Sequence, residues 1–268
     1  MNAALFDDYC SRHGVAVCHN VAETDFDPAG IALSQKDDTP LARGLNVIVP
    51  VSFAETGGYC TASCYGVLTD EVSAHLHKYR ENLFSDAALE ALDRLLRPHL
   101  DAWGYEPSRF AHRWAYSCIQ DNADNIPRDR ILPGTVRLSP DVLPTRNGLI
   151  SINSLVSMNL SDCAARGAYA VFADDRKDTV VCIASVNRTT GAEHCTEIGV
   201  ECAPAYRRRG YAVSCVAALA RELVSEGKTV LYQYYHTNTA SAAVARCTGF
   251  VPAGRFFTYS AFRKTRIL

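Results

Sequence analysis

A basic loop that contains a glycine leads directly into a predicted helix, and its residue types suit anion binding. It reads Pro204-Ala205-Tyr206-Arg207-Arg208-Arg209-Gly210-Tyr211-Ala212. The first backbone N–H groups of a helix have no partner within the helix, and the helix dipole favours negative charge there. Gly210 lets the backbone approach a ligand closely, and the arginines attract anions. The loop is predicted to bind a diphosphate, although taken alone it also fits a solvated basic turn.

The sequence around this loop resembles motif A of the GNAT acetyltransferase superfamily. The matching stretch is 197–212, in which Arg207, Gly210 and Ala212 meet the family pattern Q/R-x-x-G-x-G/A. The sequence Tyr-Arg-Arg-Arg-Gly-Tyr-Ala is most similar to that of the glycine N-acyltransferase-related branch of the superfamily.

A second motif follows at the distance that the family requires. Asn238-Thr239-Ala240-Ser241 and then Gly249-Phe250 resemble the family's N-x-x-S/A helix that ends in Gly-Phe. Both motifs are in register with the predicted strands and helices between them. The resemblance covers roughly residues 135–268.

The resemblance implies a mixed α/β sheet in which the fourth and fifth strands separate and admit the pantetheine arm of acetyl-CoA. It implies no metal. The residues that it assigns to acetyl-CoA binding are Val200, Glu201, Cys202, Arg207, Arg208, Arg209, Gly210, Tyr211, Ala212, Asn238 and Ser241.

Two residues are the candidates for catalysis, Glu197 and Ser241. An amine must lose a proton to attack a thioester, so a base or a water chain must accept it. Glu197 lies seven residues before Pro204, where many relatives carry a glutamate, and strand alternation places it on one face with Gly199 and Glu201. A solvated strand carboxylate or a structural ion pair is the alternative for Glu197, and a catalytic role for Glu201 is less favoured.

The residue at the position of the general acid differs from the family pattern. Many relatives have a tyrosine four residues before the glycine of Gly-Phe, and this chain has Ala245 there. The substitutes that remain open for the general acid are Ser241, Cys247 and one tyrosine of the run Tyr232, Tyr234 and Tyr235. A thiol nucleophile at Cys202, Cys215 or Cys247 is not favoured, because direct transfer needs no covalent intermediate.

Hydrophobic patterning predicts the elements that position these residues. In the C-terminal part, strands are expected at 168–173, 179–186, 194–202, 229–235 and 256–262, with helices after Gly210 and over 240–247. Asn238 or Thr239 can cap the second helix, and Gly227 and Gly249 end the two helices. In the N-terminal part, a hairpin is expected at 45–68, a helix from the N-cap Ser85 that Pro98 ends or kinks, and a strand at 109–119.

Prolines and polar residues concentrate after residue 120 and indicate a domain boundary near residue 130. The expected division is an N-terminal α/β domain, residues 1–130, and a GNAT domain, residues 131–268. The N-terminal domain has no assigned role and is either unrelated to GNAT or a degenerate second GNAT-like half.

Composition excludes several classes of protein. The chain has 268 residues, 48% hydrophobic and 21% charged, with a net charge of −2. A general nucleic-acid binder would be strongly basic, and no apolar run approaches the ~20 residues of a membrane span. Residues 1–10 lack the pattern of a signal peptide.

Eleven cysteines without an export signal favour reduced thiols and a cytoplasmic protein. One possible set of zinc ligands consists of Cys60, Cys64, His75 and His77. Their spacing does not fit, because one residue separates the two histidines and no second cysteine pair follows.

The sequence therefore predicts an acetyl-CoA-dependent N-acetyltransferase that acts on a small-molecule amine, such as an amino acid, a polyamine or an aminoglycoside. A protein or peptide N-acetyltransferase and a non-catalytic CoA sensor are the alternatives. A homodimer is left open.

Overall fold

The computed structural model describes residues 26–36, 45–109, 111–139, 150–153, 156–158, 160–173, 179–189 and 195–264. They form two compact units, each assembled from segments that are distant in sequence. Unit 1 contains the described residues up to Tyr116, Tyr235–Thr237, and those from Ala253 onward. Unit 2 contains Ser117–Tyr234 and Asn238–Pro252.

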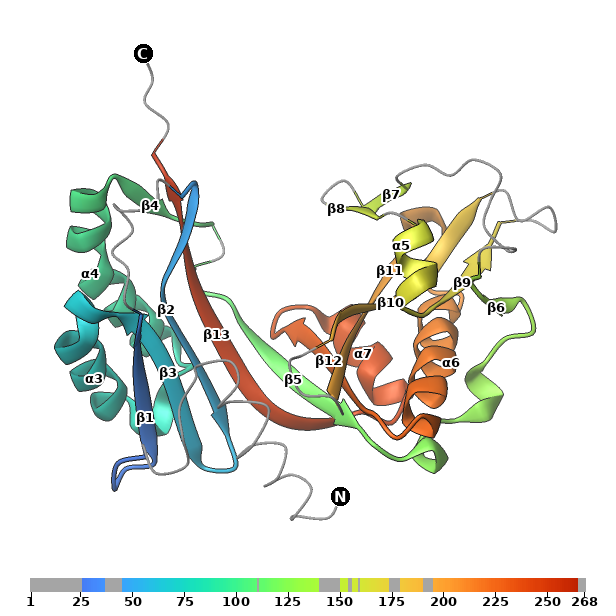
Figure 1. Ribbon diagram of the computed structural model, residues 1–268, viewed down its shortest axis with the longest axis horizontal. Helices are drawn as coiled ribbons and strands as arrows, with labels where there is room; N and C mark the ends of the chain where they lie inside the picture. Colours follow the sequence, from blue (N-terminus) through green and yellow to red (C-terminus); the bar gives the residue numbers. More distant parts are fainter. Residues whose placement is uncertain are drawn as a thin grey trace. The chain divides into compact units, whose positions relative to one another are not determined.

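The sheet of unit 1 has the strand order β1-β3-β2-β13, with the short β4 also paired to β13 (Figure 1). The strands are β1 (Ile31–Lys36), β2 (Val47–Thr56), β3 (Tyr59–Tyr65), β4 (Tyr105–Pro107) and β13 (Val251–Arg263). β2 and β3 form the predicted antiparallel hairpin, and β1 lies parallel to β3. The last strand of the chain therefore completes a sheet that begins near the N-terminus.

Two helices, α3 (Thr69–Lys78) and α4 (Asp86–Trp103), pack against the sheet of unit 1 (Figure 1). Ser85 caps α4 as predicted, because its hydroxyl accepts a hydrogen bond from Ala88 N at 3.3 Å. Of the two outcomes expected for Pro98, an end or a kink, the end is wrong, since α4 continues to Trp103. Pro98 is exposed, so the carbonyl that loses its helical donor faces water, while the leucines of the opposite face hold the helix on the core.

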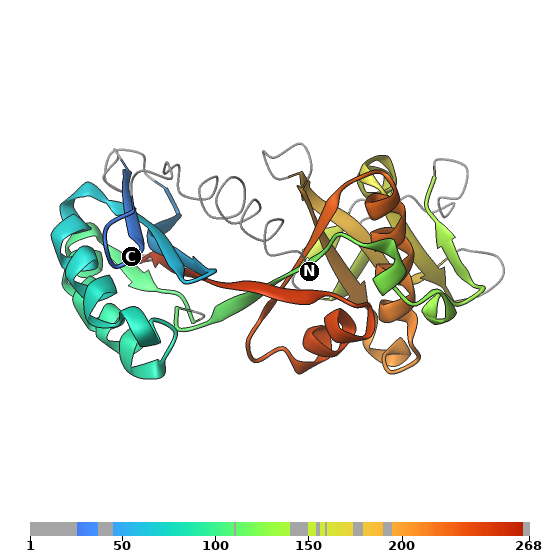
Figure 2. The same cartoon turned by 90° about the horizontal axis from the view of Figure 1, so that it is seen from below.

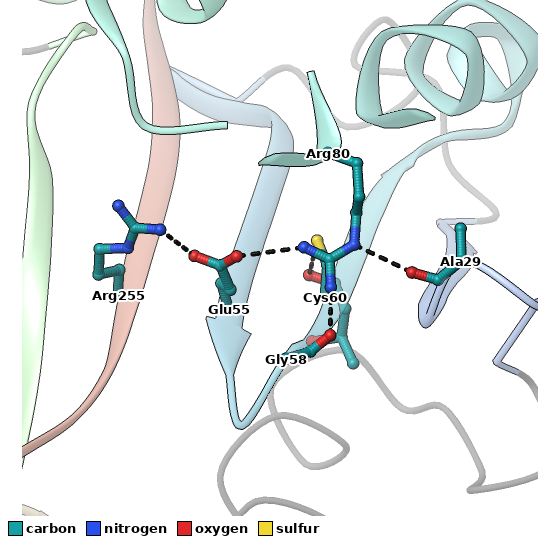
Figure 3. A network of polar contacts seen from close by, with 7 residues as sticks. Ala29, Glu55, Gly58, Cys60, Arg80 and Arg255 are labelled. Atoms are coloured by element: carbon teal, nitrogen blue, oxygen red, sulfur yellow. Dashed lines mark hydrogen bonds and ion pairs between the residues drawn. The ribbon is translucent and has the colours of Figure 1, made fainter. Parts of the chain in front are cut away.

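An ionic network fixes the closed end of the β2–β3 hairpin (Figure 3). Arg80 donates to Glu55 at 3.1 Å and to the carbonyls of Ala29, at 3.0 Å, and Gly58. Arg255 of β13 donates to the second oxygen of the Glu55 carboxylate. Glu55 thus lies between two guanidinium groups and joins β2 to β13.

The sheet of unit 2 has the strand order β5-β12-β11-β10-β9-β6. The strands are β5 (Trp114–Gln120), β6 (Thr135–Arg137), β9 (Ala168–Phe172), β10 (Val180–Thr189), β11 (Cys195–Cys202) and β12 (Thr229–Tyr235); β7 (Ile150–Asn153) and β8 (Val156–Met158) form a separate hairpin. β9, β10 and β11 are antiparallel neighbours, whereas β11 and β12 run parallel. The mixed sheet and its predicted strands are confirmed.

Helices cover both faces of this sheet (Figure 2). They are α5 (Leu160–Arg166), α6 (Tyr211–Ser225) and α7 (Thr239–Cys247). Tyr169 of β9 bonds to Glu222 of α6 at 2.8 Å, whereas its neighbours Ala168 and Ala170 pack with Leu160 and other residues of α5. Because alternate strand residues point to opposite faces, α5 and α6 lie on opposite sides of the sheet.

Short 3₁₀ segments complete the described chain, and they are η4 (Gly66–Leu68), η5 (Arg80–Asn82), η6 (Ala123–Asn125), η7 (Arg128–Arg130) and η9 (Pro204–Tyr206). In the part of the chain described, no helix combines the length and apolar character needed to cross a membrane.

The limits of the two units differ from the expected division at residue 130. The segment after Tyr116 belongs to unit 2, where Gln120 donates to the carbonyl of Gly249 at 2.6 Å. Arg221 of α6 donates to the carbonyl of Ala123 at 2.6 Å. β5 is a strand of the unit 2 sheet, and most of β13 belongs to unit 1, so composition alone does not locate the division.

Candidate functional site

The basic loop bends sharply between β11 and α6. Arg208 and Gly210 adopt left-handed backbone conformations, with φ of 62° and 80°, and α6 begins at Tyr211. Only glycine adopts this conformation without strain, and Arg208 therefore carries local strain of the kind found at ligand sites. Arg207 donates from Nε to the carbonyl of Cys202 at 3.2 Å, which ties the bend to the end of β11.

The backbone N–H groups at the start of α6 are available to a ligand. Among the described residues, no group accepts a hydrogen bond from the N–H of Arg209, Gly210, Tyr211 or Ala212. The loop is exposed from Arg207 to Gly210. Unpaired N–H groups at a helix N-terminus, with arginines beside them, are suited to bind the phosphates of a nucleotide.

A buried serine that sequence reasoning missed supports the first turn of α6. The hydroxyl of Ser214 accepts a hydrogen bond from Leu132 N at 2.8 Å and shares another with Thr135 Oγ1 at 2.5 Å. These contacts attach Leu132 and the first residue of β6 to the first turn of α6, next to the loop. A serine inside an apolar helical pattern gives no sequence signal for such a role.

The parallel strands β11 and β12 separate at their C-terminal ends, as predicted. Their pairing runs from Cys195 opposite Thr229 to Ile198 opposite Tyr232, while β11 itself continues to Cys202. On the other side, β11 remains paired to β10 as far as Cys202. Residues 199–202 of β11 therefore have no β12 partner within the described residues. We call this divergence the fork.

Two glutamates lie on the same face of β11. Glu197 and Glu201 alternate with Gly199, as predicted, and both are partly buried. The Oε2 atom of Glu201 is buried and has no hydrogen-bond partner among the described residues. Burial raises the pKa of the Glu201 carboxyl. Val200 and Cys202 point to the opposite face.

The start of α7 is capped by Asn238 and lies beside the fork. Asn238 caps the helix, because its Oδ1 accepts from Ser241 N at 3.1 Å. The Ser241 side chain lies beside the phenol of Tyr232, the last β12 residue paired to β11. Burial raises the pKa of Tyr232, which keeps its proton on the phenol.

Ala245 is buried and occupies the position where many relatives have a tyrosine. Its exposed fraction is 2%, and its carbonyl accepts from Phe250 N at 3.0 Å. The ring of Tyr232 packs against Phe250 with a centroid distance of 5.6 Å. A phenol therefore lies beside α7, but it comes from β12 instead of from the helix.

Cys202 of β11 is a poor nucleophile. Cys182 and Cys202 are opposite each other on β10 and β11, and Cys215 of α6 lies against Cys182. Burial and the neighbouring Cys182 thiol raise the pKa of Cys202 to about 12, against the lowering effect of Arg207 and Arg209. Since the thiolate is the reactive form, the Cys202 thiol is inert near neutral pH.

The four candidate zinc ligands do not form a metal site among the described residues. Cys60 and Cys64 are buried in the core of unit 1 on β3. On α3, His75 is buried against Tyr79, whereas His77 is exposed and paired with Asp27 at 2.7 Å. Within the described ranges, no group of three or more His, Cys, Asp or Glu residues has an arrangement that could hold a metal ion.

Comparison with protein families identifies this part of the chain. Residues 147–251 match the family model of the acetyltransferase (GNAT) domain. This range includes the basic loop, the fork, and the start of α7.

Solved structures of GNAT proteins are similar to this chain at low sequence identity. A GNAT-family protein from Novosphingobium aromaticivorans has 19% identity and a TM-score of 0.48, over 60% of this chain and 69% of its own. An acetyltransferase of the GNAT family from Colwellia psychrerythraea has 14% identity and a TM-score of 0.44, over 56% of each chain. A tandem GNAT protein from the clavulanic acid biosynthesis pathway has 18% identity and a TM-score of 0.38, over 62% of this chain and 58% of its own.

The matched regions cover less than two thirds of the last two proteins. No curated protein sequence matches the chain.

Proposed function

We propose that the chain, of which residues 147–251 match the acetyltransferase (GNAT) domain, transfers the acetyl group of acetyl-CoA directly to a primary amine of a small molecule. The observation that carries the proposal is the fork between β11 and β12, followed directly by a loop whose amides have no described acceptor. A strand edge and a helix N-terminus thus lie next to each other in sequence and in space.

The residues present fit acetyl-CoA. The N–H groups of Arg209, Gly210, Tyr211 and Ala212 would hold the diphosphate, and the side chains of Arg207, Arg208 and Arg209 would attract it. The strand edge over 200–202 would pair with the amides of the pantetheine arm, as Val200, Glu201 and Cys202 have no strand on that side among the described residues. Asn238 and Ser241 would lie beside the arm. When bound, acetyl-CoA supplies the activated acyl group.

Glu197 is the proposed base. It would accept the proton of the acceptor ammonium, directly or through water, so that a neutral amine is available for attack. Its support is its place on β11, opposite Leu231 of β12 and one residue before the last paired position. The same face carries Glu201.

Ser241 is the proposed donor to the departing thiolate. Its support is its position beside the Tyr232 phenol, because a buried phenol that keeps its proton can replenish the serine hydroxyl. This arrangement would replace the tyrosine that is absent at Ala245.

A reducing compartment suits this protein. Every cysteine that the structure describes is a free thiol, and free thiols persist where disulfides are kept reduced. We therefore propose a cytoplasmic reaction.

The proposal is tested by release of free thiol from acetyl-CoA in the presence of a panel of small amines, with the acetylated product detected by mass spectrometry. Added acetyl-CoA should also raise the melting temperature, since a ligand that binds only the folded state stabilises it. Glu197→Gln should lower kcat and shift its pH profile, with Glu90→Gln, an exposed glutamate of α4, as the matched control.

The proposal is wrong if millimolar acetyl-CoA leaves the melting temperature unchanged and no amine is acetylated. Wild-type kinetics in Glu197→Gln would contradict only the role of Glu197 as the base, and the proposed function would stand.

A further inference from the structure

A group of polar side chains lies on the face of the β10–β11 pair that Glu197 and Glu201 share. In the antiparallel register, Ser185 is opposite Gly199 and Ile183 is opposite Glu201. Opposed residues in a sheet point to the same face, so Ser185 belongs to the face of the two glutamates. Ser185 and Glu201 are diagonal neighbours, about 7 Å apart at their Cβ atoms, which a glutamate side chain can span.

Two polar atoms in this group are buried without a partner. Ser185 is 1% exposed, and neither its hydroxyl nor Oε2 of Glu201 has a hydrogen-bond partner among the described residues. A buried polar group without a partner is destabilising, and most such groups in folded proteins are paired. A serine hydroxyl and a carboxylate oxygen can both accept hydrogen bonds, so one group with several N–H donors could satisfy both atoms.

Asn187 supplies a third polar group to the same face. It is the residue at the irregularity of β10, between Val186 and Arg188. A Cβ on residue 199 would lie 2.9 Å from both Cγ and Oδ1 of Asn187, so the amide of Asn187 occupies the space that Gly199 leaves open. The absence of a side chain at Gly199 thus keeps an amide between the two glutamates. We call Ser185, Asn187 and Glu201 the polar triad.

We propose that the polar triad binds a second ammonium group of the acceptor, so that the acceptor is a diamine or polyamine whose reacting amine lies nearer Glu197. This inference rests on the proposed function and names the substrate class for the same site.

The chemistry of the triad favours an ammonium over other groups. An ammonium has three N–H donors and no acceptor, and it would satisfy the Ser185 hydroxyl and the Glu201 carboxylate together. Glu197 and Glu201 are four residues apart on one strand, or about 13 Å between Cα atoms. Their side chains can therefore reach the two ends of one extended diamine. An amino acid would instead place its own carboxylate beside Glu197 or Glu201, and like charges at close range repel.

The test compares amines of matched length that differ only in the second ammonium group. The pairs are 1,4-diaminobutane with 1-aminobutane and 1,8-diaminooctane with 1-aminooctane, with glycine as the carboxylate-bearing amine. The wild-type kcat/KM for the better diamine should exceed that of its monoamine by at least about tenfold. Glu201→Gln should remove this preference through a higher KM for the diamine.

Ser185→Ala provides a second variant that a purely structural role would not explain. It removes an unpaired buried hydroxyl, so the melting temperature should stay equal or rise. The KM for the diamine should nevertheless increase several-fold. Glu90→Gln makes the same chemical change as Glu201→Gln, at a side chain of α4 that is 61% exposed. It should change neither the melting temperature nor the KM for the diamine.

A binding measurement separates this inference from the proposed function. Calorimetric titration with the diamine should give heat for the wild type and none for Glu201→Gln. If amines are acetylated without preference for the diamine, or glycine is preferred, the diamine inference is wrong and the proposed function stands. If the diamine binds through Glu201 but no amine is acetylated, the proposed function is wrong and the amine site stands. Absence of both binding and preference overturns the inference.

Discussion

The side chain of Ser241, in the first turn of α7, lies beside the phenol of Tyr232 on β12. Tyr232 is opposite Ile198, the last pair before the fork. The two hydroxyls therefore lie at the point where the strands diverge, whereas Ala245, one turn further along α7, provides only a methyl group.

Ser241→Ala should lower kcat by about tenfold or more, because a positioned proton donor to the leaving group is lost. The KM for acetyl-CoA should change much less, because the diphosphate loop is not touched. Steady-state kinetics with a saturating amine measure both constants. Ser241→Thr keeps the hydroxyl and should restore most of the rate. Equal kcat for the wild type and the alanine variant would exclude Ser241 as the donor.

Gly210→Val should abolish acetyl-CoA binding. The residue has a φ of 80°, which valine adopts only with strain, and its side chain would cover the N–H groups of the loop. Gly227→Val is the matched control, because Gly227 has a φ of 81° and follows the other end of the same helix. Both variants should lose similar stability, of the order of 1–3 kcal/mol. Only Gly210→Val should lose the rise in melting temperature on addition of acetyl-CoA, and a normal rise would contradict the loop assignment.

The local part of the site could be predicted from the sequence because its signals are short-range. Helix α6 follows from apolar recurrence and from Gly227 at its end, and Asn238 caps α7 through a bond to a residue three positions ahead. The fork was expected from the family resemblance and is confirmed by the register. The diphosphate-binding role of the loop and the roles of Glu197 and Ser241 remain predictions.

The parts that sequence reasoning missed depend on contacts between distant segments. β13 pairs with β2 roughly two hundred residues earlier, and nothing in either strand encodes that partner. Helix α3 was not predicted from the sequence. The triad was missed because the position of Ser185 depends on the strand register, and Asn187 lies over Gly199 only because β10 is irregular there.

Gly249→Ala should destabilise the protein far more than Gly227→Ala. Gly249 has a φ of 76°, and a Cβ there would collide with the carbonyl oxygen of Asn125 and lie 2.9 Å from Gln120 Nε2. At Gly227 nothing lies within 4 Å, so only the left-handed backbone penalty of about 1 kcal/mol applies. Thermal unfolding measures the difference. Equal melting temperatures for the two variants would contradict the packing of residues 120–125 against the end of α7.

Glu222 should stabilise unit 2 in a pH-dependent manner. Burial alone would raise its pKa, but hydrogen bonds from Arg137 and Tyr169 and the charge of Arg137 outweigh burial and lower it. A carboxyl whose pKa is lower in the folded state contributes stability above its unfolded pKa of about 4.3, and the contribution is lost as the pH falls through the folded value.

Glu222→Gln should therefore lower the melting temperature by about 2–6 °C at pH 7, equivalent to roughly 1–2 kcal/mol. The difference from the wild type should shrink as the pH falls below about 4 and vanish once the native carboxyl is protonated. Calorimetric scans from pH 3 to pH 7 measure this trend. Glu226→Gln is the control, because Glu226 forms an exposed pair with Lys228 that contributes little. A Glu222→Gln deficit that is constant across this pH range would mean that the charge of Glu222 does not stabilise the fold.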